Sequence, residues 1–165
     1  IYDYSVSDAI ALKAAYKPSK SGGLESSTEV GIAYTGIDGL TVKAAMGENN
    51  DLADQIDLSV FSAVYANGPI TVGIQTNESD RGTGTDEDFT AYGVSYAVND
   101  DVSVSYGVST LDYSSTLEDQ ESSAVSVSFT AGGVAISASH QSTDNVAGAA
   151  AADNTSYEVN FSFSF

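Results

Sequence analysis

Positively charged residues are few in this chain, and three of them follow a regular pattern. The sequence has 5 Lys and Arg against 23 Asp and Glu, which gives a net charge of −18. Lys13 and Lys17 lie on the polar side of an alternating segment at 9–17, and Lys43 lies on the polar side of another at 40–48. The alternating segment between them, 26–35, has Glu29 on its polar side. Because side chains of extended strands alternate between two faces, we expect these four groups on one face, with Lys13, Glu29 and Lys43 at similar heights above the short turns.

A patch of this kind acts on ions by electrostatics and needs no bond to break. Charged groups that line a water-filled passage bias which ions enter it. Our hypothesis is that the lysines face acidic groups across such a space and create a transverse field. The alternative is that they are solvated side chains paired with Glu29, with little effect. The other basic residues, Lys20 and Arg81, are expected in exposed loops.

Other residues that could support chemistry form no recognised site. Segment 78–88 is rich in carboxylates, the oxygen ligands that Ca²⁺ prefers, but it matches no calcium-loop motif, so a solvated loop is the favoured interpretation. His140 is the only histidine, which leaves it without a companion for a metal site or a catalytic relay. The sequence has no Cys, and it has no nucleotide loop, zinc spacing or Ser/His/Asp constellation. We therefore expect no enzyme and no cofactor apart from a weak possibility of Ca²⁺, and the acidity argues against nucleic acid.

The elements that would position these residues are short β-strands. Apolar and polar residues alternate in run after run, separated by turn-forming residues, which predicts an all-β fold. The expected strands, eleven in all, are 1–6, 9–17, 26–35, 40–48, 56–66, 70–77, 89–98, 101–110, 122–131, 134–142 and 155–165. Segment 56–66 alternates poorly, which suggests a β-bulge or contact with another subunit.

The connections between these strands alternate between two kinds. Short turns occupy residues 7–8, 36–39, 67–68, 99–100 and 132–133, whereas longer acidic and polar loops occupy 18–25, 49–55, 78–88, 111–121 and 143–154. Outer-membrane barrels have short periplasmic turns and longer extracellular loops. The pattern therefore predicts an antiparallel up-and-down transmembrane β-barrel rather than a soluble sandwich.

The last strand supports a membrane location. Tyr157, Phe161, Phe163 and Phe165 fall on one side of it, and Ser and Asn alternate with them on the other. Lipid-facing strands carry apolar residues outward, with aromatic girdles at the interfaces, and polar residues inward. We expect these four aromatics to form part of a girdle and a C-terminal assembly signal. The polar faces carry mostly Ser, Thr, Gly and Asn, which suits a wet lumen lined by Lys13, Lys17, Glu29 and Lys43.

On these residues the chain resembles the C-terminal portion of a Gram-negative general porin of the alphaproteobacterial type. The matching features are the end Phe161-Ser-Phe-Ser-Phe165, segments such as Ala91-Tyr-Gly-Val-Ser-Tyr96, and the acidic loops. The resemblance implies the last eleven of about sixteen strands, a homotrimer in the outer membrane among lipid and lipopolysaccharide, and passive diffusion of ions and small hydrophilic solutes. The family's inward-folded loop has no counterpart in this sequence.

Several alternatives stay open at this stage. An odd strand count suggests that residues 1–165 form a single barrel domain that lacks its N-terminal strands, because single-chain bacterial barrels have even strand numbers. A ten-stranded barrel from residue 9 to residue 165 is the alternative. For function, the alternative to a channel is a non-conducting barrel that acts as structural anchor, adhesin or phage receptor.

Overall fold

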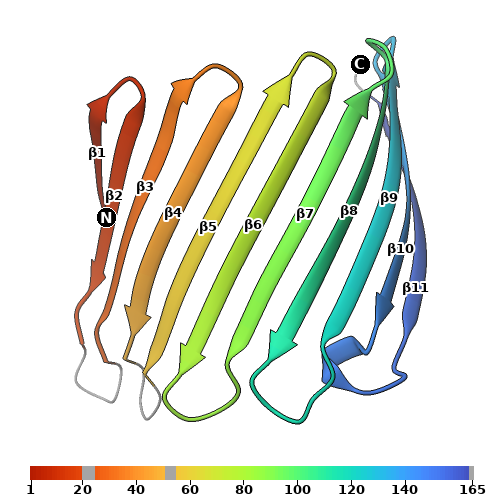
Figure 1. The fold of residues 1–165 in the computed structure, drawn as a ribbon. Helices are drawn as coiled ribbons and strands as arrows, with labels where there is room; N and C mark the ends of the chain where they lie inside the picture. The colour runs from red at the N-terminus through yellow and green to blue at the C-terminus, as the bar shows by residue number, and fades with distance from the viewer. Residues whose placement is uncertain (20–24, 51–54, 164–165) are drawn as a thin grey trace.

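The structure is a computed structural model, and it describes residues 1–19, 25–50 and 55–163. It consists of one antiparallel sheet of eleven strands in which each strand pairs with its neighbours in sequence (Figure 1). The strands are β1 (Tyr2–Ser7), β2 (Ile10–Lys17), β3 (Ser27–Ile37), β4 (Leu40–Asn49), β5 (Ile56–Asn67), β6 (Ile70–Arg81), β7 (Glu87–Ala97), β8 (Val102–Tyr113), β9 (Gln120–Ala131), β10 (Val134–Asp144) and β11 (Asn154–Phe163). A short 3-10 turn, η1 (Val146–Gly148), lies between β10 and β11. No helix in the described part of the chain is long and apolar enough to cross a membrane.

The all-β up-and-down fold expected from the sequence is confirmed. Short turns join the strands at one end of the sheet and longer connections join them at the other (Figure 1). Glycine is required in at least one short turn: Gly39 has φ 75°, and a Cβ there would lie 2.1 Å from the carbonyl oxygen of Ala66. A tight reversal of this kind fixes the register of the strands beside it.

Several boundaries differ from the prediction, and the differences have one cause. Strands β6 to β11 extend further toward the long loops than expected, so segment 78–88 is largely strand and only 82–86 connects β6 to β7. The acidic residues there resembled loop residues in the sequence, although backbone pairing does not depend on side-chain charge. Arg81, expected in an outer loop, is the last residue of β6.

Strand β5 contains no β-bulge, contrary to one of the two interpretations of its poor alternation. It pairs with β4 and β6 in unbroken register over Ile56–Asn67. The ladders shift instead near short turns, between Ser5 and Ser7 and between Tyr34 and Ile37. The poor alternation therefore reflects apolar residues on both faces of a regular strand.

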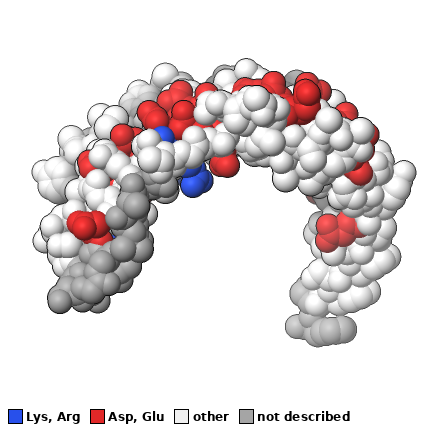
Figure 2. Space-filling model, turned by 90° about the horizontal axis from the view of Figure 1, so that it is seen from below, with Lys and Arg blue, Asp and Glu red and all other residues white. Residues whose placement is uncertain are grey.

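The sheet curves into an arch and does not close (Figure 2). Strand β1 is a genuine strand paired with β2, and β2 is paired on its other side with β3, so a ten-stranded barrel that begins at residue 9 is excluded. The described residues include no buried hydrophobic side chain, and the large apolar side chains lie exposed. Whatever covers these apolar side chains is therefore not another layer of this sheet.

Candidate functional site: the two faces of the arch

Strand register assigns every side chain of the sheet to one of two faces. Directly opposed residues of antiparallel strands point to the same side. One face carries the apolar residues, for example Tyr92, opposed to Ile74 and Val108. The other face carries the small and polar residues, for example the opposed pair Ser105 and Ser126, whose hydroxyl oxygens are 2.7 Å apart.

The small, polar face is the concave one. The four described basic residues, Lys13, Lys17, Lys43 and Arg81, all fall on this face by register. Figure 2 shows basic atoms projecting from the inner side of the arch. In a barrel, this side encloses the lumen and the convex side faces outward.

The predicted lysine patch lies on the concave side of β2, β3 and β4. Lys13, Glu29 and Lys43 line one shallow hollow of about 400 Å³. They are not at one height: Lys13 belongs to the row that contains Gly31 and Ala45, whereas Glu29 lies nearer the long loops and Lys43 nearer the short turns. Lys17 lies at the loop end of β2, opposite Ser27, and does not line this hollow.

Sequence reasoning missed the ion partner of Lys13. The Lys13 Nζ atom lies 3.5 Å from an Asp3 carboxylate oxygen across the β1–β2 ladder, and both side chains are exposed. In the described part of the chain, Glu29 forms no ion pair with either lysine, so the pairing that the alternative interpretation assumed is not seen. The sequence did indicate the position of Asp3. It alternates with the aromatic residues Tyr2 and Tyr4, which places its carboxylate on the same polar face as Lys13.

The convex face is organised in tiers from the short turns to the long loops. Apolar and aromatic side chains fill the first tier, and hydroxyl residues such as Thr76, Thr90 and Thr110 follow at the next level. At the loop ends, every strand from β4 to β10 presents a carboxylate outward: Glu48, Asp57, Glu78, Asp80, Asp88, Asp112, Glu121 and Asp144. Apolar surface thus gives way to charge at one level around the arch.

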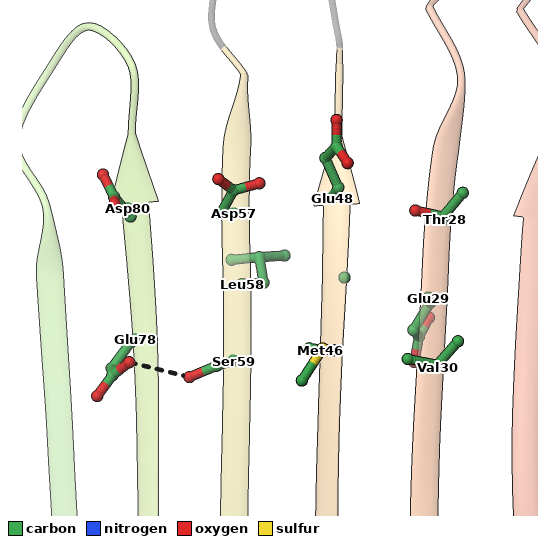
Figure 3. Close-up of a pocket in the computed structure, with 11 residues that line it drawn as sticks. Thr28, Glu29, Val30, Met46, Glu48, Asp57, Leu58, Ser59, Glu78 and Asp80 are labelled. Atoms are coloured by element: carbon green, nitrogen blue, oxygen red, sulfur yellow. Dashed lines mark hydrogen bonds between the residues drawn. The ribbon is translucent and has the colours of Figure 1, made fainter.

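Figure 3 shows part of this carboxylate row. Glu48, Asp57 and Asp80 lie side by side near the loop ends of β4, β5 and β6. Glu78 accepts a hydrogen bond of 3.1 Å from the Ser59 hydroxyl. Of the carboxylates of segment 78–88, three belong to the convex row, Glu87 faces the concave side and Asp86 lies in the connection, so they do not form one cation loop. No group of three or more possible metal ligands occurs among the described residues.

The aromatic residues that the sequence predicts for a girdle lie on the convex face of β11 as far as the structure describes them. Tyr157, Phe161 and Phe163 all point outward there, and each is more than half exposed. The Tyr157 ring stacks at a tilt on His140 of β10, with ring centroids 4.5 Å apart, which gives the lone histidine a contact on the outward face. Phe165 and Lys20 lie outside the described residues.

No protein-family model matches the sequence, and a search of curated protein sequences finds no match. Solved structures do match. An anion-selective porin from Comamonas acidovorans superimposes with a TM-score of 0.82 at 12% identity, covering 99% of this chain and 58% of that one. OmpT, an outer membrane protein of Vibrio cholerae, superimposes with a TM-score of 0.66 at 18% identity, covering 97% of this chain and 60% of that one. A trimer form of the same protein superimposes with a TM-score of 0.65 at 20% identity, covering 97% of this chain and 61% of that one.

At these identities the likeness establishes the fold and nothing finer. The chain spans about three fifths of the length of the structures that it matches. The sequence predicts an up-and-down barrel of the outer-membrane kind, and the likeness to these structures confirms that fold. The chain has the antiparallel up-and-down architecture of outer-membrane β-barrel proteins, with eleven strands of that architecture present.

Proposed function

We propose that this chain forms most of the wall of a porin in the outer membrane of a Gram-negative bacterium, a water-filled channel for passive diffusion of ions and small hydrophilic solutes. The observation that carries the proposal is the contrast between the two faces of the arch. The convex face is apolar and aromatic, as lipid requires, and the concave face is lined by small polar side chains, as a wet lumen requires.

The proposal includes strands beyond these eleven. Strands β1 and β11 each have one edge that is unpaired within the sheet. Unpaired backbone N–H and C=O groups cannot face lipid, so a membrane sheet must close on itself. Further strands of the same protein between these two edges would close the barrel. The trimer form of the similar OmpT supports a homotrimer as part of the proposal.

The lysine patch is proposed to set ion preference. Lys13, Lys17 and Lys43 lie on the concave face, and Lys43 has no ion pair among the described residues. Lumen substitutions in porins change selectivity, and the similar porin from Comamonas acidovorans is anion-selective. No catalytic activity, nucleic acid or resident cofactor is part of this proposal.

Single-channel conductance in a planar bilayer tests the proposal. The protein is isolated intact from outer membranes in detergent and added to a lipid bilayer under voltage. A porin trimer gives stepwise conductance that closes in units of three. A well-folded, heat-resistant barrel that conducts nothing would overturn the channel and leave a structural anchor, adhesin or phage receptor in its place.

A further inference from the structure

A second hollow, of about 590 Å³, lies on the concave face over β3 to β8, and its lining does not match the rest of that face. Elsewhere the concave side chains are mostly small and polar. Here four apolar side chains line the same space, from β5, β7 and β8: Leu58, Val60, Phe89 and Leu111. We call this space, defined by these residues together with Glu29, Asn77 and Glu87, the apolar hollow.

Cross-strand register shows how the apolar hollow is built. One row of opposed residues runs from Ala45 through Val60, Asn77 and Phe89 to Leu111. The next row toward the long loops runs through Glu29, Gly47, Leu58, Ser79 and Glu87. Apolar side chains of β5 on one side and of β7 and β8 on the other therefore flank the polar Asn77 and Ser79 of β6. The residues named in the adjoining row begin and end with a carboxylate.

The two carboxylates, Glu29 and Glu87, differ in whether a cation lies beside them. Glu87 lies 4.0 Å from the Arg81 guanidinium, so its charge is partly compensated. Glu29 forms no ion pair among the described residues, and its Cβ and Cγ lie close to Gly47, 3.7 Å from where a Cβ of that glycine would stand. Because Gly47 has no side chain, no side chain covers the concave surface between Glu29 and Leu58. A carboxylate that forms no ion pair among the described residues, although Lys13 and Lys43 line a hollow with it, thus borders the apolar surface.

Water does not solvate this surface well. Leu58 is 47% exposed and Val60 is 37% exposed, although both face the side that encloses the lumen. Covering apolar area stabilises a complex in proportion to the area covered, and hollows of roughly 300–1,000 Å³ with few convergent polar groups are typical of small-molecule sites. A small ligand that covers Leu58 and Val60 while it places a positive charge at Glu29, two strands away, satisfies both requirements.

We propose that the apolar hollow is a binding site for small amphipathic cations, molecules that join an aromatic or alkyl body to an ammonium group. The proposal rests on the proposed function in one respect, since it takes the concave face to line a water-filled lumen. Such molecules would pause there while crossing the channel and obstruct the flow of smaller ions. Neutral sugars and inorganic ions would not be retained.

The test measures obstruction of ion current through the intact protein in a planar bilayer, with phenyltrimethylammonium as the probe. Two companion probes separate its parts: tetramethylammonium has the charge without the ring, and benzenesulfonate has the ring with the opposite charge. Saturable reduction of current by phenyltrimethylammonium, at concentrations where the companions have no effect, supports the proposal. Equal reduction by benzenesulfonate overturns it.

Variants place the effect in the apolar hollow. Leu58→Asn and Val60→Thr should each raise the half-blocking concentration about tenfold, since each exchanges apolar contact for a polar group. Glu29→Gln should weaken the cation by about threefold to tenfold, because it removes the free charge. Val64→Thr is the matched control: Val64 lies on the same face of β5 but does not line the hollow, so the half-blocking concentration should stay unchanged. An equal effect of Val64→Thr overturns the assignment.

Calorimetric titration of the detergent-solubilised protein separates this proposal from the channel itself. Binding heat that is lost in Leu58→Asn, in a protein that conducts nothing, supports the site and overturns the porin. Conductance without current reduction or binding heat overturns the site and leaves the porin.

Discussion

At the residue scale, the charges that matter most are those on the concave face. Lys43 is exposed there and unpaired within the described ranges, whereas Lys13 is held beside Asp3. We predict that Lys13→Glu combined with Lys43→Glu shifts the reversal potential under a salt gradient toward cation preference, because each exchange turns a positive charge negative. The shift should shrink as salt rises from about 0.1 M to 1 M, where the Debye length falls from about 10 Å to 3 Å. An unchanged reversal potential at low salt would exclude this patch from selectivity.

A second residue-scale prediction concerns Asp86, which joins two loops. Its carboxylate accepts a 2.8 Å hydrogen bond from the Arg81 backbone N–H, and its own N–H donates a 2.8 Å bond to the Ser114 hydroxyl. Asp86→Ala removes the first acceptor, so the connection 82–86 should be cleaved faster by an added protease. Asp86→Asn keeps an oxygen acceptor and is the control, with cleavage closer to the parent rate. Equal rates in all three proteins would show that this bond does not restrain the loop.

At the element scale, each strand has one apolar face and one polar face. A charge introduced at two consecutive residues of a strand should therefore affect the stability of the barrel differently. Val125 of β9 points to the convex face and Ala124 to the concave face. We predict that Val125→Lys destabilises the folded barrel in lipid by about 2–4 kcal/mol, the cost of a basic residue near the bilayer midplane. Ala124→Lys, the matched control, should fold like the parent because its ammonium stays in water. Denaturant unfolding in vesicles measures both, and equal stability of the two variants would contradict the face assignment.

Alternation of side chains was enough to predict the strands and their face assignment, because period two is a local property of extended backbone. The alternation of short turns and longer loops predicted the strand order. It predicted Lys13, Lys17, Glu29 and Lys43 on one face, and the structure places them there. Alternation could not predict strand ends in acidic segments, since the carboxylates of 78–88 resemble a loop. Nor could it explain β5, where Leu58 and Val60 are apolar on the polar face and line a hollow with Phe89 and Leu111 of β7 and β8.

At the scale of the whole molecule, the open sheet determines which pairs of introduced cysteines are close enough to form a disulfide. The sequence has no Cys, so any intramolecular disulfide must join two introduced cysteines. Ser105→Cys with Ser126→Cys should oxidise readily, since these residues oppose each other on β8 and β9 within the range that a disulfide spans. Ser5→Cys in β1 with a cysteine anywhere along β11 should give no intramolecular disulfide. A disulfide between β1 and β11 would show that these eleven strands close by themselves.

The lack of a buried apolar interior has a consequence for how the molecule comes into being. In water, a chain of this kind has no centre around which to collapse, because most of its large apolar side chains lie exposed on the convex side of a single sheet. With that side in lipid, the bilayer takes the place of the core that a soluble protein builds from its own residues. Folding and insertion are then a single event, and until it occurs the unpaired strands are exposed to pairing with those of another copy.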